Sequence, residues 1–261
     1  MPEKPEISVE AYRKRSRRSL LAGGAAAVAG LFGWRWVQNQ PETDNIPNVL
    51  RKGHEFNESL WKSLFRHDHQ ARTFDREAAS ILRLNGRIGL RSEIDLDGWQ
   101  LTVKGPDGTE LGRHVLDDIK RLPYHEMTVE HKCIEGWAQI TNWGGARFSD
   151  FMRLYEDQLP DDISHVYMQT PDDQYYLRNG NRTRDHYYTS CDIETMLHNQ
   201  TLLAYNNLGE PIDELHGAPL RLATPLKYGI KQLKRIGEIQ FLTETGGDYW
   251  GERGYDWYAG L

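Results

Sequence analysis

Short apolar runs, several of them alternating with polar residues, recur from residue 99 onward and predict β-strands. Alternation with a period of two turns one face of a strand towards a core and the other towards water. The strands predicted in this way are residues 99–103, 128–131, 165–169, 202–205, 220–223 and 236–242. The pattern therefore favours a fold that is rich in short strands.

Helical periodicity is confined to a few short segments. Apolar residues at helical spacing predict helices over 55–65, 116–121 and 148–155. Asp192 stands where an N-cap would begin a further helix over 192–198. Many strands, few helices and no repeated strand–helix alternation predict an α+β, mainly β, fold. About 220 residues remain beyond the first forty, a length that favours one domain over two.

Residues 1–40 differ in composition from the rest of the chain. Ser16-Arg17-Arg18-Ser19 leads into an uncharged stretch of sixteen residues, Ser19 to Trp34, that is rich in alanine and glycine. Paired arginines before an apolar segment predict a twin-arginine export signal. The stretch is shorter than the roughly twenty residues that span a bilayer, so a cleaved signal and an N-terminal anchor both stay open. An ordinary basic N-terminus with a short buried helix is the alternative.

Charge divides the chain at the same place. Residues 1–40 hold seven basic and three acidic residues, whereas the rest holds 25 basic and 35 acidic ones. An acidic body of this kind argues against nucleic acid as a partner. Two prolines and no apolar period mark residues 37–50 as a linker. We therefore expect a linker with a short helix over 41–75 and the main domain over 76–261.

The candidate chemistry begins with the cysteines. Cys133 and Cys191 are too few for a disulfide framework, and Arg221, Lys231 and Lys234 follow Cys133 by 88 to 101 residues. A thiolate is a soft metal ligand, while Arg binds phosphate as a bidentate fork and Lys as a point charge. The pattern predicts one metal ligand and a cradle for an anionic cofactor. A structural cysteine, a Cys133–Cys191 bridge and a solvated basic face are the alternatives.

Two neighbouring features bear on this hypothesis. His131 and Lys132 stand next to Cys133, and we expect their charges to help hold its thiol deprotonated. His67-Asp68-His69 has the residue types of a second metal site. Because alternating side chains on a short loop face apart, we expect a solvated surface there instead.

Four segments of the chain resemble, in order and in spacing, the sulfite oxidase superfamily of molybdenum enzymes. They are Cys133-Ile134-Glu135-Gly136-Trp137, Leu202-Leu203-Ala204-Tyr205 with Gly209-Glu210-Pro211, His216-Gly217-Ala218-Pro219-Leu220-Arg221, and Lys227 to Lys234. The resemblance is greatest to the exported bacterial branch typified by the catalytic subunit of periplasmic methionine-sulfoxide reductase. It runs from about residue 80 to 245, whereas residues 45–75 match poorly.

The resemblance implies a sulfite oxidase-type molybdopterin-binding fold without the C-terminal dimerisation domain of classical sulfite oxidases. It also implies a molybdenum held by the dithiolene of one molybdopterin, with Cys133 as the metal ligand. Glu135 beside it is implied as a catalytic residue that tunes the metal or accepts hydrogen bonds from the pterin. The residues implied in cofactor binding are His54, Glu55, Thr170, His216, Arg221, Gln232, Leu233 and Lys234.

Individual roles follow from the same resemblance. Arg221 and Lys234 would hold the pterin phosphate, and His216 would hydrogen-bond the pterin. Gln232 and Leu233 would offer backbone contacts.

The activity implied is two-electron oxygen-atom transfer at molybdenum, with reduction of sulfoxides expected. A sulfite-oxidising enzyme of the same fold and a cofactor-free exported binding module are the alternatives. The sequence holds no Cys-x-x-Cys-His, so no c-type haem is attached, and we expect a separate electron-transfer partner, a membrane haem protein. With the export signal, the resemblance predicts a monomeric catalytic subunit in the periplasm that acts on a small-molecule or protein-bound sulfoxide, or on sulfite.

Overall fold

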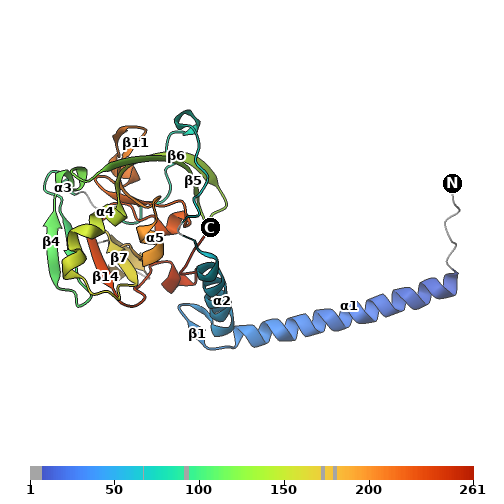
Figure 1. Cartoon of the computed structure of the whole chain (residues 1–261). Helices are drawn as coiled ribbons and strands as arrows, with labels where there is room; N and C mark the ends of the chain where they lie inside the picture. Colours follow the sequence, from blue (N-terminus) through green and yellow to red (C-terminus); the bar gives the residue numbers. More distant parts are fainter. Residues whose placement is uncertain (1–7, 67, 91–93, 172–173, 179–180) are drawn as a thin grey trace. The chain divides into compact units, whose positions relative to one another are not determined.

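The computed structural model describes residues 8–66, 68–90, 94–171, 174–178 and 181–261. It divides into two units, residues 1–55 and residues 56–261, which are described one after the other. Figure 1 shows the elements of both units along the chain.

The first unit begins with a single long helix, α1 (Val9–Gln38), which has no buried residue. The Ser8 side chain caps it by accepting a hydrogen bond from the Ala11 backbone N–H at 3.2 Å. Its 30 residues make it about 45 Å long. By length and composition it is a helix that could cross a membrane. The uncharged stretch seen in the sequence is therefore the middle of a longer helix.

A small hairpin joins α1 to the next helix. Strands β1 (Glu42–Thr43) and β2 (Ile46–Pro47) pair, and α2 (Asn48–Leu64) follows at once and continues into the second unit. The Asn48 N–H donates to the Pro41 carbonyl at 2.8 Å, which ties the start of α2 to the hairpin. The helix predicted over 55–65 is confirmed, but it begins seven residues earlier. The segment interpreted as a linker is largely ordered by these hydrogen bonds.

The second unit contains a five-stranded sheet in the order β10-β7-β14-β3-β4. Its central pair, β14 and β3, is parallel, and the other pairs are antiparallel. The strands are β3 (Leu101–Lys104), β4 (Glu110–His114), β7 (His165–Gln169), β10 (Tyr188–Asp192) and β14 (Glu238–Leu242).

A second sheet carries the segments with candidate chemistry. Its order is β12-β11-β6-β5, with β13 also paired to β11. The strands are β5 (Tyr124–Lys132), β6 (Ala138–Arg147), β11 (Leu202–Asn207), β12 (Glu210–Pro211) and β13 (Arg221–Ala223). In β6 a Cβ on Gly145 would lie 2.1 Å from the Leu203 carbonyl oxygen. Only glycine allows β6 and β11 to approach this closely. A separate hairpin joins β8 (Gln174–Arg178) and β9 (Asn181–Asp185).

Three short α-helices and several 3₁₀ turns connect the strands. They are α3 (Leu116–Lys120), α4 (Phe148–Met152), α5 (Ile193–Leu197), η1 (Arg76–Ala78), η2 (Arg153–Gln158), η3 (Glu214–His216), η4 (Gly229–Lys231) and η5 (Gly251–Arg253). Asp192 caps α5 as predicted, since its side chain accepts a hydrogen bond from the Thr195 N–H at 2.8 Å. The helix predicted over 148–155 tightens into a 3₁₀ turn, η2, after Met152.

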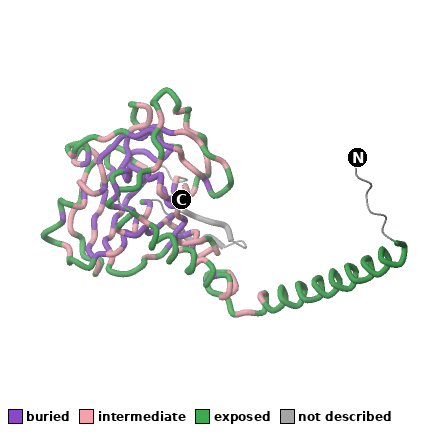
Figure 2. The backbone as a smooth tube through the Cα atoms, turned by 45° about the vertical axis from the view of Figure 1, so that its right-hand side comes forward, coloured by how far each residue is buried: buried purple, intermediate pink, exposed green. Residues whose placement is uncertain are grey.

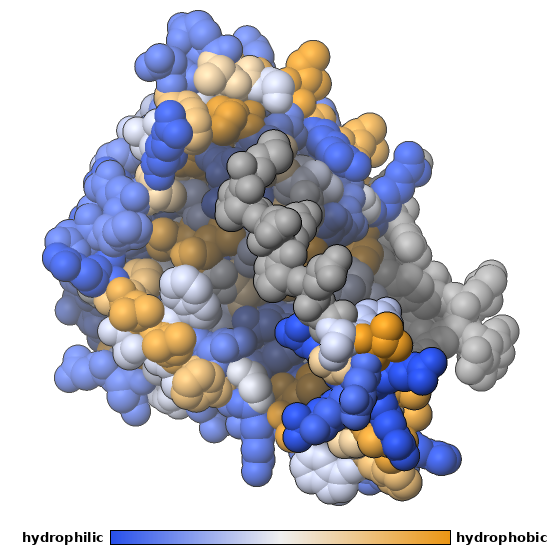
Figure 3. All heavy atoms as spheres, turned by 90° about the vertical axis from the view of Figure 1, so that its right-hand side faces the viewer, coloured by the Kyte–Doolittle hydropathy of each residue, from blue (hydrophilic) through white to orange (hydrophobic). Residues whose placement is uncertain are grey.

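The main core draws side chains from both sheets and from α4. Residues with no exposed surface include Leu101, Val103, Phe148, Phe151, Leu203, Leu222, Ile239 and Phe241. Each such side chain contributes about 1.5–3 kcal/mol through its removal from water. Figure 2 shows this buried interior of the second unit in purple, whereas α1 has no buried residue and is exposed along nearly all of its length. On the face shown in Figure 3, hydrophobic side chains are interspersed among hydrophilic ones.

The predicted class, α+β and mainly β, is confirmed. Residues 165–169 form β7 with the predicted bounds, and the strand predicted over 128–131 is the end of the longer β5. The predictions omitted β6, the longest strand described, together with β4 and β10.

Candidate active site

Cys133 occupies the turn that joins β5 to β6. Its N–H donates to the Trp137 carbonyl at 2.9 Å, and its own carbonyl accepts from the Gly136 N–H at 3.0 Å. Gly136 has a φ of 87°, which a residue with a side chain rarely adopts. The turn buries Cys133 to 6% exposure. The Asn85 side-chain amide lies 3.6 Å from its sulfur. A thiol is thus held at a fixed place at the end of a long strand.

The surroundings of this thiol differ from those predicted. Burial raises the pKa of the Cys133 thiol, although the Glu135 backbone N–H acts in the opposite direction. Burial also lowers the pKa of His131 to about 4, so that ring is neutral at pH 7. Lys132 pairs with Glu130 at 3.3 Å. The hypothesis that His131 and Lys132 hold the thiol deprotonated is therefore wrong.

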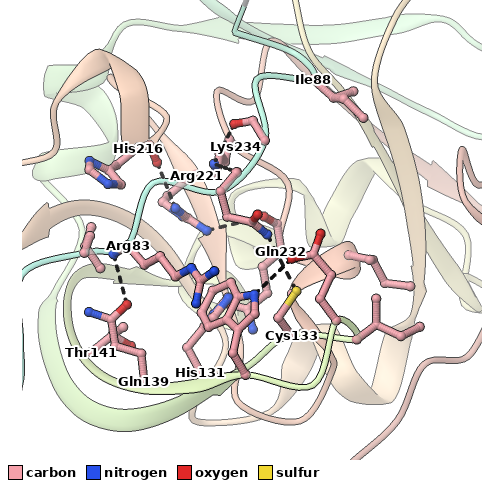
Figure 4. Close-up of a pocket in the computed structure, with 18 of the residues that line it drawn as sticks. Arg83, Ile88, His131, Cys133, Gln139, Thr141, His216, Arg221, Gln232 and Lys234 are labelled. Atoms are coloured by element: carbon pink, nitrogen blue, oxygen red, sulfur yellow. Dashed lines mark hydrogen bonds between the residues drawn. The ribbon is translucent and has the colours of Figure 1, made fainter.

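Cys133 opens onto a cavity of about 280 Å³. The cavity lies between the β5–β6 turn, the loop around residue 85 and the segment from residue 216 to 234, as Figure 4 shows. Its lining includes Arg83, Asn85, Ile88, His131, Cys133, Glu135, Trp137, Trp143, Tyr187, His216, Arg221, Gln232, Lys234 and Trp250. Six of the predicted site residues meet here, namely Cys133, Glu135, His216, Arg221, Gln232 and Lys234.

Arg221 is a buried cation at the first position of β13, with 4% of its surface exposed. The three hydrogen bonds that described residues make with its guanidinium all go to backbone carbonyls, the shortest to His216 at 2.8 Å. Its guanidinium carbon lies 4.4 Å from the centroid of the Trp143 ring. Burial lowers the pKa of Arg221 to about 10, so the side chain stays charged at pH 7.

Lys234 is the second cation of the cavity. Its Nζ donates to the Asn85 carbonyl at 2.6 Å and lies 3.4 Å from the Gly86 carbonyl. Burial, and then the charge of Arg221, lower the pKa of Lys234 to about 8. The two cations repel each other, and each bonds neutral carbonyls. They leave an excess of positive charge at this end of the cavity.

Two other buried cations, Lys227 and Lys231, form ion pairs with buried carboxylates. Lys227 lies 2.9 Å from Asp192, and Lys231 lies 2.7 Å from Asp248. All four side chains are at most 4% exposed. A buried charge is costly unless an opposite charge compensates it. These two lysines are neutralised within the protein, and Lys231 lies outside the cavity lining.

His216 presents an unpartnered nitrogen to the cavity. Its Nδ1 lies 2.8 Å from the Asp213 carboxylate, which can only accept a hydrogen bond, so Nδ1 carries a proton. Its Nε2 is buried without a hydrogen-bond partner among the described residues. Buried polar atoms are rarely left in this state. The ring is therefore oriented to bond a group that enters the cavity.

The remaining predicted cofactor contacts in this unit differ in placement. Gln232 lines the cavity, and its backbone carbonyl accepts from Arg221 at 3.4 Å. Leu233 has a fully buried side chain in the core and is not part of the lining. Thr170 is also outside the lining, and its hydroxyl accepts from the Tyr187 N–H at 3.3 Å. The roles predicted for Leu233 and Thr170 stay predictions.

Glu135 lies on the exposed rim of the cavity, two residues after the thiol. Its carboxylate accepts a hydrogen bond from the Trp137 indole N–H at 3.0 Å. Arg83 covers the other part of the same indole, with its guanidinium carbon 4.8 Å from a Trp137 ring centroid. The rim thus combines a carboxylate, a cation and an aromatic surface.

The cavity side chains that sequence reasoning missed include Arg83, Asn85 and Trp250, whereas Tyr187, for which core packing was the favoured interpretation, also lines the cavity. Tyr187 donates from its hydroxyl to the Ile230 carbonyl at 2.8 Å and accepts from the Trp250 indole at 3.1 Å. Asn85-Gly86 is a dipeptide typical of turns, but nothing in the local sequence indicates that this turn meets Cys133 and Lys234.

The other predicted positions lie elsewhere. His54 and Glu55 are on α2 in the first unit, and their role stays a prediction. His67 is outside the described residues, and no group of three or more potential ligands occurs among the side chains that are described. Cys191 is buried and, like Cys133, is a free thiol, so the alternative of a bridge between them is wrong.

The cavity fits a molybdopterin group. Such a group needs a soft ligand for the metal, cations for its phosphate and hydrogen-bonding groups for its ring. Cys133, the cations Arg221 and Lys234, which donate to backbone carbonyls, and the Nε2 of His216, which has no hydrogen-bond partner among the described residues, supply these in one space. A metal bound by protein side chains alone would need a cluster of ligands that the described residues lack.

Comparison with known proteins gives relatives along most of the chain. The family described as "Oxidoreductase molybdopterin binding domain" matches residues 88–250. A protein predicted to be a protein-methionine-sulfoxide reductase subunit, YedZ1 of Azospira oryzae, is 32% identical over 257 residues, 97% of this chain and 89% of its own. The protein-methionine-sulfoxide reductase catalytic subunit MsrP of Xanthomonas campestris is 29% identical over 161 residues, 60% of this chain and 49% of its own.

Among solved structures, the sulfane dehydrogenase SoxCD from Paracoccus pantotrophus aligns with 68% of this chain and 46% of its own. Its TM-score is 0.48 at 18% identity. The family match covers the thiol turn, both cavity cations and His216, and it lies within the domain expected over 76–261. The chain therefore belongs to the oxidoreductase molybdopterin binding domain family of the sulfite oxidase superfamily, and it is a molybdenum-dependent oxidoreductase with a molybdopterin cofactor.

Proposed function

We propose that this chain is the catalytic subunit of a sulfoxide reductase, with protein-bound methionine sulfoxide as its substrate class. The observation that carries the cofactor site is the pair Arg221 and Lys234, which form no ion pair with a carboxylate among the described residues, in one cavity with the Cys133 thiol. The relatives named as protein-methionine-sulfoxide reductase subunits support the substrate class.

The cavity residues divide the work of holding the cofactor. Cys133 would ligate the metal, Arg221 and Lys234 would bind the phosphate, and His216 would donate or accept a hydrogen bond at the pterin. When bound, the group supplies two-electron exchange and oxygen-atom transfer. The protein keeps these parts in fixed positions, since each anchor is itself bonded to backbone carbonyls or to a carboxylate.

The rim residues serve the substrate. Reduction of a sulfoxide to a thioether takes up two electrons and two protons and releases water. Glu135 is the one carboxylate among the described lining residues, and it is open to solvent. We assign it the delivery of protons to the leaving oxygen. Trp137, Ile134 and Trp250 give the same rim an apolar surface suited to a methyl thioether.

The electrons would come from a separate partner, and a membrane haem protein is the candidate that we propose. The leader supports an extracytoplasmic location, with Arg17 and Arg18 as the export signal. Five basic residues over 13–18 precede the apolar part of α1. Basic residues flanking a membrane helix stay on the cytoplasmic side, which would place the catalytic domain on the opposite side, in the periplasm.

Substrate preference separates sulfoxide reduction from sulfite oxidation. Cofactor-loaded protein would be supplied with a reduced viologen and either a methionine sulfoxide peptide or free methionine sulfoxide. In parallel, it would be given sulfite with an oxidised electron acceptor. We expect turnover with the peptide and not with sulfite, and no turnover in Cys133→Ser. Turnover with sulfite alone would replace this proposal with the sulfite-oxidising alternative.

A further inference from the structure

The second half of α2 turns its apolar side chains towards water. Phe56, Leu60 and Leu64 follow one another at intervals of four residues, so they lie on one side of the helix. They are 69%, 46% and 59% exposed, and the neighbouring Trp61 is 45% exposed. We call these four residues the apolar face of α2.

The polar side of the same helix faces the domain. Glu58 and Lys62 pair at 2.7 Å, and the Glu58 side chain is only 23% exposed. The Lys62 ammonium lies 5.5 Å from the centroid of a Trp257 ring. A surface helix ordinarily buries its apolar stripe against the core and leaves its charges in water. In α2 the polar side packs on the domain and the apolar face is exposed. An exposed apolar surface of this kind indicates a site of contact with another molecule or with a membrane.

The chain leading into α2 indicates what that cover is. The Asn48 N–H bonds the Pro41 carbonyl at 2.8 Å, and Pro41 is three residues beyond the last residue of α1, Gln38. Three residues span at most about 11 Å. The first turn of α2 is therefore close to the end of a helix that is long and apolar enough to cross a membrane. The headgroup region of a bilayer is roughly 5–8 Å deep on each side.

We propose that the apolar face of α2 lies in the headgroup region of the bilayer that α1 crosses, and that it sets the catalytic domain against the membrane surface. The residue pattern favours lipid over a protein partner. Trp61 is at the edge of the face, as tryptophan is in membrane interfaces. Lys52, four residues before Phe56, flanks the face and matches anionic headgroups. This inference goes beyond the proposed function and does not depend on the reaction.

Site-specific labels on the full chain test the contact. A polarity-sensitive fluorophore would be attached to Phe56→Cys, to Leu60→Cys and to Ser59→Cys, which is exposed but outside the apolar face, about 100° around the helix from Leu60. Each protein would be reconstituted in vesicles of phosphatidylcholine with one part in five phosphatidylglycerol. Labelling of the unsubstituted chain measures the background from Cys133 and Cys191, which are buried.

Lipid contact predicts a distinct result at each position. The labels at 56 and 60 should emit at shorter wavelength and be quenched by lipids that carry a nitroxide near the headgroup, whereas the label at 59 should be quenched by iodide in the water. Iodide quenching at all three positions would overturn the proposal. Protection at 56 and 60 that grows with protein density at constant lipid would also overturn it, because a second copy would then be the cover.

A matched pair of charge variants gives an independent readout. Leu60→Glu and Ser59→Glu add the same charge at adjacent positions, on and off the apolar face. With the label at position 56, Leu60→Glu should abolish nitroxide quenching and Ser59→Glu should preserve it. Both proteins should keep the molybdenum content of the unsubstituted chain, since neither position lines the cavity. Equal quenching in the two variants would contradict lipid contact through this face.

Discussion

Replacing Arg221 by methionine should separate cofactor binding from folding. Arg221 is buried, charged and bonded only to backbone carbonyls among the described residues. Methionine keeps the length of the side chain and can still cover the Trp143 ring, but it carries no charge. The account predicts a folded protein that has lost its hold on the phosphate.

The structure gives the size of the expected changes in stability and in cofactor affinity. The lowering of the Arg221 pKa from 12.5 to about 10 corresponds to a cost on the order of 3 kcal/mol for keeping the cation in the cofactor-free protein. The lost hydrogen bonds offset about 1–2 kcal/mol of that relief. Cofactor-free Arg221→Met should therefore be as stable as the parent protein, or more stable by about 1–2 kcal/mol. Loss of a two-bond fork to phosphate costs about 3 kcal/mol, or roughly 100-fold in cofactor affinity.

Lys231→Met is the matched control. Lys231 is equally buried, but its ammonium lies 2.7 Å from the Asp248 carboxylate. Removal of one partner of a buried pair leaves the other charge uncompensated and destabilises a protein by about 3–5 kcal/mol. Urea unfolding of both cofactor-free variants, with molybdenum per chain and turnover per molybdenum after loading, measures the contrast. Full molybdenum occupancy in Arg221→Met with collapsed turnover would refute the phosphate assignment and move Arg221 to the substrate pocket.

Three further predictions test other parts of the account. Cys133→Ser should remove activity from a folded protein because a hydroxyl is a poor soft ligand, whereas Cys191→Ser should leave turnover unchanged; full turnover in Cys133→Ser would contradict the ligand assignment. Burial lowers the pKa of Lys234 to about 8, so its proton is lost as pH rises through that value and cofactor affinity should fall by up to about tenfold per pH unit above it. Cofactor affinity measured over a series of pH values should show this fall in the parent chain but not in Lys234→Arg. Affinity that does not change with pH in either protein would exclude Lys234 from phosphate binding. Arg17→Lys with Arg18→Lys should hold the loaded enzyme in the cytoplasm, as cell fractionation would detect, and normal export would contradict the signal.

The cavity ligands could be predicted because each lies in a short local motif. Cys133 and Arg221 stand in contiguous runs whose residue types already indicate metal and phosphate chemistry. The local sequence does not show that Lys231 forms an ion pair in the folded protein whereas Arg221 and Lys234 bond backbone carbonyls. Lys231 finds its carboxylate seventeen residues away, at Asp248, and sequence spacing does not indicate which cation will be neutralised by folding.

The strand β6 shows why part of the fold could not be predicted. Its burial does not alternate, because Thr141 and Asn142 are as buried as Trp143. The Asn142 amide is satisfied inside the sheet by the Thr128 hydroxyl at 3.0 Å. Gly144 and Gly145 then interrupt any apolar run, yet a Cβ at either would lie 2.1 Å from a neighbouring atom. Because β6 is an interior strand whose glycines allow neighbouring groups to approach closely, its sequence lacks the alternation of apolar and polar residues by which a strand is predicted.

The central claim is that Cys133 ligates the molybdenum of a cofactor bound in the cavity that it shares with Arg221 and Lys234. X-ray absorption at the molybdenum edge, on loaded parent protein and on loaded Cys133→Ser with the metal content of each measured, tests it most directly. The account predicts about one molybdenum per chain in the parent protein and one sulfur ligand fewer in the variant. An unchanged number of sulfur ligands in Cys133→Ser would contradict it.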